Sequence, residues 1–488
     1  MLLEFERAAG IILHPTSLPS DYGIGELGRE AIEFIDFLAA GRQKLWQILP
    51  LNPVGYGESP YQCYSAFAGN TLLISLEKLG SEGFLTKDEL AWAPEFPLDR
   101  VDFKLVKLYK NSLLRKAFYR FSFLPKCHCY LDFVERNRYW LPDFALFMSL
   151  KEYFSERPWN EWDKEVALRD PEALKYYEKL LATDIKYHYF LQYKFHCQWI
   201  ELKEYAKKQG ITIIGDLPIF VSYDSSDTWV NPHLFTLDAE GYPAKVAGVP
   251  PDYFSETGQL WGNPHYRWNV MGKDDFFWWR QRFEKLLEWV DVIRIDHFRG
   301  FEAYWEINGA AETAVNGKWV KGPDKIFFAT IEKYLGRLPI IAEDLGFITP
   351  EVVELREAFS FPGMKVLQFT WQESLTPDSK DENVIFYTGT HDNDTLLGWY
   401  KEKVIDGLRV DYDSLDKEEI CYGFLEIVYQ SRAKWALAPL QDILCLGRGA
   451  RMNTPGTVNG NWQWRYSKAG LTERIAQRLA ELTEAYAR

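Results

Sequence analysis

Cysteine is scarce in this chain, and the cysteines it has are scattered. Six occur in 488 residues, too few for a small disulfide-stabilised scaffold, and we therefore expect reduced thiols. Only the motif "CHC" brings two of them close together, at Cys127 and Cys129. No second Cys/His cluster follows at zinc-finger spacing, so we expect no metal site there.

Long apolar runs and an excess of positive charge are also missing. No stretch approaches the roughly 18 apolar residues of a membrane helix, and the opening "MLLEFERAAG" carries charges without the long apolar region of a secretory signal. The net charge of −14 argues against nucleic acid or an anionic membrane surface as partner. We expect a cytoplasmic protein that binds neither of them.

Phosphate-binding loops are absent as well. The motif "GIGELG" (23–28) has the glycine spacing of a dinucleotide site and precedes a helical stretch. However, Pro15 and Pro19 interrupt the strand that such a site needs, and residues 41–57 contain no acidic residue to hold a ribose. We therefore expect no nucleotide cofactor.

Aromatic side chains, in contrast, are abundant, at 16% of the chain. Such side chains fill cores, and their faces also stack on planar or pyranose rings. The excess by itself is a weak indication of a carbohydrate or a nucleobase as ligand.

Short apolar stretches that end in polar, Gly or Pro residues recur along the chain, and helical patterns follow most of them. Eight such stretches are expected to be strands: 10–20, 45–53, 211–220, 290–298, 338–346, 364–371, 383–393 and 439–447. The alternation predicts an α/β fold, a parallel (β/α)8 TIM barrel. A doubly wound sheet is the alternative.

We expect one barrel over residues 1–488 with two insertions. Helical patterns between the second and third strands predict a largely helical insertion subdomain at about 70–205. The segment 221–264 is dense in Gly, Pro, Asp and aromatic residues. Long irregular loops in a compact domain are usually functional, so this second insertion is expected to be an active-site loop.

The stretch "VDVIRIDHFRG" (290–300) combines a buried strand with charged residues. Strand alternation puts Arg294 and Asp296 on one face and the isoleucines on the other. The isoleucines fit the helix-covered side of a barrel, so Arg294 and Asp296 should point inward near the carboxyl end of the strand, where barrel active sites lie. A purely structural Arg–Asp pair is the alternative.

Acidic residues recur at the ends of other expected strands. Asp216 ends the third strand, "AEDLG" places Glu343 and Asp344 at the end of the fifth, and "GTHDN" places Asp392 at the end of the seventh. Acids that converge on one barrel mouth raise each other's pKa, which marks functional sites more often than structural ones. Alternation leaves open whether Glu343 or Asp344 faces inward.

Two carboxylates on either side of a sugar acetal can break a glycosidic bond. One is ionised and attacks the anomeric carbon, and the other donates a proton to the leaving oxygen. Arg294 favours the ionised form of Asp296, which suits a nucleophile. Neighbouring negative charge raises the pKa of Glu343, which suits the acid.

Around these residues the chain resembles the amylomaltases, or 4-α-glucanotransferases, of the α-amylase clan. Ten segments in family order carry the resemblance: "HPTSLPS" (14–20), "YGIGELG" (22–28), "WQILPLNP" (46–53), "ESPYQCYSAFAGN" (58–70), "IGDLPIFV" (214–221), "GVPPDYFSETGQLWGNP" (248–264), "IRIDHFRG" (293–300), "IAEDLG" (341–346), "GTHDN" (389–393) and "ARMNTPGTVNGNWQWR" (450–465). The resemblance spans nearly the whole chain. It implies a (β/α)8 barrel with insertions that transfers α-1,4-glucan segments between maltooligosaccharides or starch-type glucans, with retention.

By motif position, the resemblance implies Asp296 as nucleophile, Glu343 as acid/base and Asp392 as the carboxylate that stabilises the transition state. The residues it implies for substrate binding are Arg294, Asp216, His391, Tyr61, Ser59, Asp252, Gln259, Trp261, Asn453 and, at a remote groove, Tyr56. Trp46 and Trp462 are expected in the core. No metal and no cofactor is implied, and we expect a monomer.

Two other functions stay open. A plain α-glucan hydrolase would use the same carboxylates and differ only in whether water or a sugar hydroxyl reaches the glycosyl-enzyme. We expect the 248–264 loop to exclude water and bind an acceptor, which favours transfer. A glucan-binding protein without turnover would not need the intact Asp/Glu/Asp set that this chain has.

Overall fold

A closed barrel of eight parallel strands forms the centre of the molecule. The structure, a computed structural model, describes residues 6–251, 255–374, 382–405 and 415–488. The strands are β1 (Ala8–Ile12), β2 (Leu45–Gln47), β3 (Thr212–Pro218), β6 (Val292–Asp296), β9 (Ile340–Ala342), β10 (Gly363–Val366), β11 (Val384–Tyr387) and β12 (Trp435–Pro439). They pair in the order β10-β11-β12-β1-β2-β3-β6-β9.

A backbone contact joins the two ends of this sheet. The N–H of Ala342, in β9, donates to the carbonyl of Pro362, directly before β10, at 2.9 Å. The sheet therefore has no open edge, which confirms the predicted (β/α)8 barrel and excludes the doubly wound alternative.

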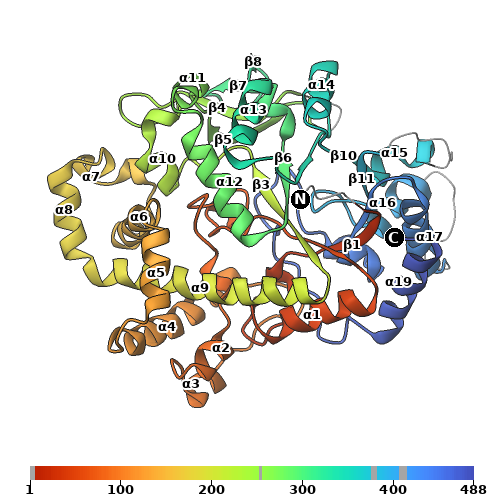
Figure 1. Ribbon diagram of the computed structural model, residues 1–488, viewed down its shortest axis with the longest axis horizontal. Coiled ribbons are helices and arrows are strands. Elements are labelled where there is room, and N and C mark those ends of the chain that lie inside the picture. Colours follow the sequence, from red (N-terminus) through yellow and green to blue (C-terminus); the bar gives the residue numbers. More distant parts are fainter. Residues whose placement is uncertain (1–5, 252–254, 375–381, 406–414) are drawn as a thin grey trace.

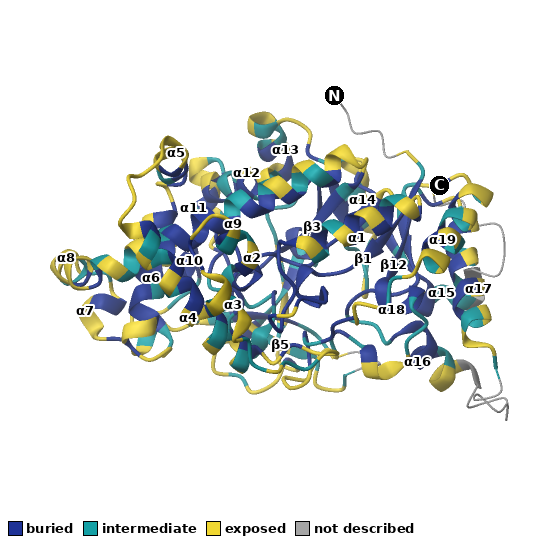
Figure 2. Ribbon diagram, turned by 90° about the horizontal axis from the view of Figure 1, so that it is seen from below, coloured by how far each residue is buried: buried dark blue, intermediate teal, exposed yellow. Residues whose placement is uncertain are grey.

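Two apolar layers follow from the alternation of side chains along the strands. Val292 packs inside the barrel with Ile214 and Ile341, one from each adjoining strand. Ile293 and Ile295 belong to the outer core, under the helices. Figure 2 shows the strands as buried ribbons inside a shell whose outer surface is exposed. The predicted orientation of "VIRID" is therefore correct.

Helices cover the outside of the barrel (Figure 1). They are α1 (Arg29–Ala40), α9 (Ala182–Lys208), α12 (Phe277–Trp289), α13 (Asp324–Leu335), α14 (Pro350–Ala358), α15 (Leu367–Ser374), α16 (Leu396–Tyr400), α17 (Lys417–Gln430), α18 (Leu440–Ile443) and α19 (Glu473–Ala485). In α1 the buried residues Phe34, Ile35 and Leu38 recur at helical spacing, so the helix turns one apolar face to the strands. None of the described helices is long and apolar enough to cross a membrane.

The stretch between β2 and β3, expected to form the helical insertion, contains seven helices before α9, and they lie to one side of the barrel in Figure 1. Before α9 they are α2 (Leu76–Ser81), α3 (Lys87–Ala91), α4 (Phe103–Ser122), α5 (His128–Arg136), α6 (Leu141–Tyr153), α7 (Lys164–Ala167) and α8 (Pro171–Leu180). Asp102 caps α4 by accepting from the N–H of Leu105 at 3.0 Å. Inside, Lys110 of α4 forms a fully buried ion pair with Glu26, which ties the insertion to the barrel.

A four-stranded antiparallel sheet lies beyond the carboxyl ends of the strands. Its members are β4 (Lys245–Val249), β5 (Gln259–Pro264), β7 (Ala303–Asn308) and β8 (Lys318–Lys321), in the order β5-β4-β7-β8. Two of these strands, with the short helix α10 (Ser226–Val230), lie in the segment 221–264 that we expected to be irregular. The partner β7 comes from a distant part of the chain, so the local composition gave no sign of the pairing.

Two further expectations were wrong. The eighth strand is Trp435–Pro439, and helix α18 occupies Leu440–Ile443 within the predicted 439–447. Pro439 ends the strand and precedes the helix, and three of the five strand residues are Ala or Pro, which give a weak apolar signal. The thiols are not all reduced either. Cys127 and Cys129 form a disulfide, with Cα atoms 5.4 Å apart, within disulfide range.

Candidate active site

Arg294 and Asp296 both lie in β6 and reach the mouth of the barrel. The Nη1 of Arg294 donates to Asp296 Oδ1 at 3.0 Å. It also donates to both carboxylate oxygens of Asp216, at 2.8 and 2.7 Å. Asp216 is directly opposite Arg294 in the β3–β6 pair, so strand register alone brings these two side chains together. One buried guanidinium thus links two carboxylates at adjacent strand ends.

Glu343 follows β9, the next strand of the barrel. Its Oε2 accepts from the main-chain N–H of His297 at 2.6 Å. His297 has φ 54°, a left-handed conformation that turns its N–H toward the neighbouring strand end. Asp344 points elsewhere, because it accepts from Arg356 Nη1 and from the N–H of Met364, both at 2.7 Å. The structure therefore settles the open choice: Glu343 faces the site.

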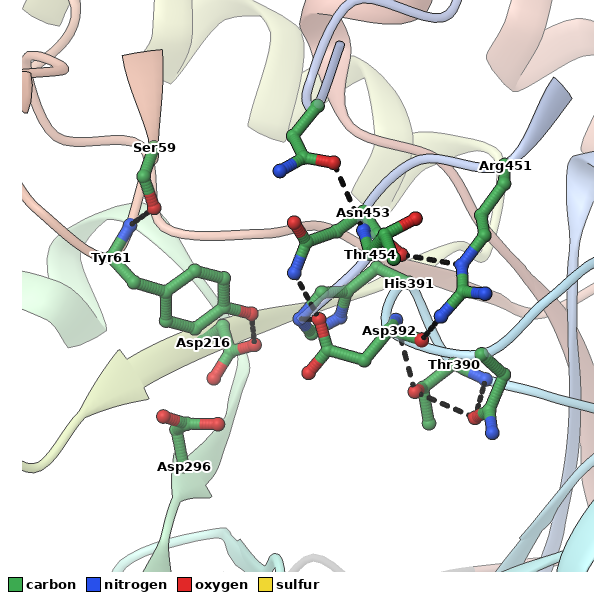
Figure 3. A network of polar contacts seen from close by, with 12 residues as sticks. Ser59, Tyr61, Asp216, Asp296, Thr390, His391, Asp392, Arg451, Asn453 and Thr454 are labelled. Carbon is green, nitrogen blue, oxygen red and sulfur yellow. Dashed lines mark hydrogen bonds and ion pairs between the residues drawn. The ribbon is translucent and has the colours of Figure 1, made fainter. Parts of the chain in front are cut away.

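Asp392 follows β11 and is held by the C-terminal part of the chain (Figure 3). Asn453 Nδ2 donates to Asp392 Oδ1 at 2.6 Å. Arg451 Nη2 donates to the main-chain carbonyl of Asp392 at 2.6 Å, and Arg451 Nε donates to the carbonyl of Asn453 at 2.7 Å. His391 Nε2 lies 3.4 Å from Asp392 Oδ1. The turn that carries this carboxylate is thus fixed from two sides.

Tyr61 connects the two halves of the site. Its hydroxyl donates to Asp216 Oδ2 at 2.7 Å, and its ring stacks on His391 with centroids 5.1 Å apart and planes at 17°. Ser59 Oγ accepts from the N–H of Tyr61 at 3.2 Å and so fixes the turn before it. Trp462, expected in the core, is buried, and its ring centroid lies 5.7 Å from that of Tyr61.

Burial is the largest influence on both carboxyls at the mouth. It raises the pKa of Asp296 well above its ordinary value; Arg294 opposes the rise, and the charges of Asp216, Glu343 and Asp392 add to it. Burial also raises the pKa of Glu343, although Arg294 and the N–H of His297 lower it. The sequence argument for Asp296 considered Arg294 alone and missed this net rise. The direction predicted for Glu343 is correct.

These shifts describe a coupled pair. Asp296 and Glu343 act on each other's charge, so the loss of the first proton favours retention of the second. Of the two carboxyls only Asp296 is in direct contact with Arg294, and this contact favours the ionised form of Asp296 against the rise that burial causes in its pKa. The arrangement can provide a nucleophilic carboxylate beside a proton donor.

The remaining expected sugar-binding residues lie on the antiparallel sheet or at the surface. Trp261, in β5, packs edge-on against His297 with centroids 4.9 Å apart, and its Nε1 donates to Gln259 Oε1 at 3.1 Å. Tyr56 is 77% exposed and so is available to a ligand. Asp252 lies outside the described residues.

Comparisons with known proteins decide the family. A family profile described as 4-alpha-glucanotransferase matches residues 13–472. The chain belongs to this family. It is 48% identical to the 4-alpha-glucanotransferase of Synechocystis, over 99% of this chain and 98% of that protein. It is 46% identical to the 4-alpha-glucanotransferase of Thermus thermophilus, over 99% of each chain.

A solved structure agrees with this assignment, and a second one shares the fold. An amylomaltase from Streptococcus agalactiae in complex with acarbose matches with a TM-score of 0.95 and 42% identity, over 99% of this chain and 100% of that one. An amylomaltase from Corynebacterium glutamicum, at 17% identity and a TM-score of 0.79, shows the same fold. The resemblance found in the sequence motifs is therefore confirmed.

Two residues of the 4-alpha-glucanotransferase site escaped the sequence argument. Arg451 was part of a quoted motif, but nothing in the motif shows that it holds the main chain of Asp392. His14, two residues after the end of β1, is buried, and burial together with the charge of His391 lowers its pKa to about 3. It lines a cavity of about 20 Å³ with His391 and Gln441. The rule that polar residues at strand ends mark the site, applied to the first strand, would have found it.

The described residues contain no group of three or more His, Cys, Asp or Glu side chains that could hold a metal ion. The carboxylates of the site are instead matched with protein donors: Arg294 for Asp216 and Asp296, and Asn453 for Asp392.

Proposed function

We propose that this 4-alpha-glucanotransferase moves α-1,4-glucan segments between maltooligosaccharides by a retaining double displacement, with Asp296 as nucleophile and Glu343 as acid/base. The observation that carries the proposal is the coupling of these two carboxyls at the ends of β6 and β9, of which Asp296 alone is in direct contact with Arg294. That asymmetry gives the two groups different protonation states and hence different roles.

In the first step, Asp296 attacks the anomeric carbon of the donor glucan. The bond from that carbon to the glycosidic oxygen breaks, and the oxygen takes the proton of Glu343 as the leaving glucan departs. In the second step, the ionised Glu343 removes the proton of an acceptor 4-hydroxyl, which attacks the same carbon and releases Asp296. Two inversions at one carbon give net retention.

The other polar residues would hold the sugar whose bond is broken. Asp392, fixed by Asn453 and the main-chain contact with Arg451, is placed to bind hydroxyls and to favour a distorted ring. Burial lowers the pKa of His391, so it would meet the sugar as a neutral ring. Arg294, Asp216 and Tyr61 would complete this pocket, with Ser59 behind them.

The site draws all three carboxylates from one chain, which supports a monomer as the working unit. We also propose that the barrel and its insertions over 1–488 act as one catalytic body. Gln259, Trp261 and Asp252 would contact the glucan beyond the reacting sugar, and Tyr56 would hold it at a more remote groove. The cytoplasmic location stays a prediction.

The test is incubation of the purified protein with maltotriose alone, with all products followed by chromatography and total reducing ends counted. We expect longer glucans together with glucose or maltose, at constant reducing ends, because each transfer breaks one glycosidic bond and forms another. Rising reducing ends with only shorter products would make the protein a hydrolase.

A further inference from the structure

Two exposed aromatic rings lie near the mouth of the barrel and have no role in the site described so far. Phe347 is 69% exposed and lies four residues after Glu343. Trp319, in the outer strand β8, is 37% exposed. Large exposed aromatic side chains beside a catalytic centre are candidates for ligand contact, because water is readily displaced from their faces.

A single buried arginine holds both of them. Arg299 is 5% exposed and lies three residues after Asp296. Its Nη1 donates to the main-chain carbonyl of Phe347. Its guanidinium lies 3.8 Å from the ring centroid of Trp319 and 5.8 Å from that of Phe347. The loops that carry the nucleophile and the acid/base thus meet at this arginine.

Trp319 is also held from a second side. Trp305 is its direct partner in the β7–β8 pair, and the two rings meet edge to face with centroids 5.2 Å apart. Trp305 is itself anchored, since its Nε1 donates to the carbonyl of Ala314 at 2.9 Å. A ring fixed by both neighbours loses little conformational freedom when it binds a ligand.

The position of Phe347 indicates which part of a glucan it would meet. Glu343 protonates the leaving glucan and later takes the proton of the acceptor, so both of these lie on its side of the broken bond. Four residues of chain span at most about 14 Å. Phe347 is therefore within reach of the sugars that extend from Glu343 toward the reducing end of an acceptor.

We propose that Phe347 and Trp319 form an acceptor platform, a subsite where pyranose rings of an α-1,4-glucan stack on aromatic faces beyond the first acceptor sugar. The inference rests on the proposed function and deepens it, because the platform selects the length of the acceptor. Arg299 positions the platform and is not a contact to the reacting atoms.

The test separates acceptor binding from donor binding. α-Maltotriosyl fluoride serves as donor, because its leaving group is a fluoride ion and its sugars occupy only the donor side. Glucose, maltose, maltotriose and maltotetraose serve as acceptors. For Phe347→Ala and Trp319→Ala we expect the KM of maltotetraose to rise about three- to tenfold, the range of one aromatic stacking contact, while the KM of glucose stays unchanged.

A matched control is Phe123→Ala, which removes an equally exposed ring, 71% exposed and just past the end of α4 in the helical insertion. Phe123→Ala should leave the KM of every acceptor unchanged. Equal effects on glucose and maltotetraose in the platform variants would overturn the proposal, because they would indicate disturbance of the catalytic loops. Unchanged KM values for all acceptors in Phe347→Ala and Trp319→Ala would also overturn the proposal.

A binding measurement without turnover distinguishes failure of the platform from failure of the proposed function. In an Asp296→Asn background, calorimetry with maltohexaose should show weaker binding when Phe347→Ala or Trp319→Ala is added. If the wild-type protein hydrolyses maltotriose without transfer, the proposed function fails. The platform fails as well only if Phe347→Ala and Trp319→Ala leave the affinity for maltohexaose unchanged.

Discussion

Asp296 and Glu343 illustrate how one burial effect can serve two opposite roles. Burial raises the pKa of both carboxyls, yet only Asp296 has Arg294 within 3.0 Å. Glu343 instead accepts a neutral main-chain N–H. A contact with a cation favours the ionised form more strongly than a contact with a neutral donor. This contact supports the proposed placement of the pair's proton on Glu343, and it acts against the larger burial-driven rise in the pKa of Asp296.

We predict that Asp296→Asn and Glu343→Gln each lower disproportionation of maltotriose by at least about 10³-fold, because each removes a covalent or a proton-transfer role. α-Maltotriosyl fluoride distinguishes the two, since fluoride leaves without an acid. Formation of the glycosyl-enzyme from this donor should recover in Glu343→Gln and not in Asp296→Asn. Near-normal rates in either folded variant would refute the assignment.

The rate should follow a bell-shaped function of pH. Asp296 must be ionised, so activity is lost as pH falls through its raised pKa. Glu343 must be protonated in the first step, so activity is lost as pH rises through its raised pKa. Ordinary carboxyls titrate near pH 4, and the midpoints of both limbs should therefore lie above this pH. Because the two carboxyls interact, each midpoint is an apparent pKa of the pair. An upper limb of kcat/KM that is identical in the residual activity of Glu343→Gln would assign that limb to another group.

Arg451 acts on the third carboxylate only through the main chain. Because it binds the carbonyls of Asp392 and Asn453, we predict that Arg451→Met lowers kcat about 10- to 100-fold with little change in KM, as expected when a transition-state contact is misplaced. Arg451→Lys should recover part of the loss. When Arg451→Met is combined with Asn453→Ala, the loss of kcat should be smaller than the two single losses combined. Full additivity would show that Arg451 does not work through this turn.

At the scale of elements, strand positions were predicted most accurately where charged residues directly follow an apolar strand. The strand that carries Asp296 was predicted together with the side that faces inward, whereas for the strand that precedes Glu343 the alternation left open whether Glu343 or Asp344 faces inward. β12 was misplaced because Ala436 and Ala438 give little periodic signal. β4 and β7 were missed because their pairing joins distant segments, and no local pattern records such a contact.

The insertion depends on one pair that local patterns also do not reveal. Lys110 and Glu26 have side chains only 0% and 2% exposed, and Lys110 also donates to the carbonyl of Ile74 at 2.8 Å. We predict that Lys110→Met lowers the free energy of unfolding by about 3–5 kcal/mol, because it leaves a carboxylate buried without its cation. Urea denaturation monitored by circular dichroism measures this.

Two controls make that prediction specific. The double variant Lys110→Met with Glu26→Gln should regain much of the stability, since no charge remains buried. Arg29→Met breaks an exposed pair, 76% and 54% exposed, and should change the stability far less than Lys110→Met, because water and salt screen an exposed pair. Burial raises the pKa of Glu26 to about 7 against the pull of Lys110. The loss in Lys110→Met should therefore be smaller at about pH 5 than at about pH 8, because protonation neutralises Glu26; an equal loss would mean that the charge is not its cause.

At the scale of the whole molecule, the first and last strands close the barrel, since β1 pairs with β12. The site accordingly collects side chains from Tyr61 to Asn453. Motif order along the sequence could reveal which residues belong together, because the strand ends of a barrel share one mouth. It could not reveal which main-chain groups hold them, because those contacts depend on the path of loops such as the left-handed turn at His297.

The net charge of −14 gives the last prediction. An α-1,4-glucan is neutral, so the long-range field of the protein neither attracts nor repels it, and the charged groups of the site are buried or half-buried at the barrel mouth, where salt screens less than at an open surface. We predict that kcat/KM for maltotriose changes less than about twofold between about 0.05 and 0.5 M NaCl. A maltotriose derivative with an amino group provides the contrast, because its positive charge should make its affinity fall as salt rises. A steep loss of maltotriose activity with salt would mean that exposed surface charges outside the site take part in binding the neutral glucan, contrary to this prediction.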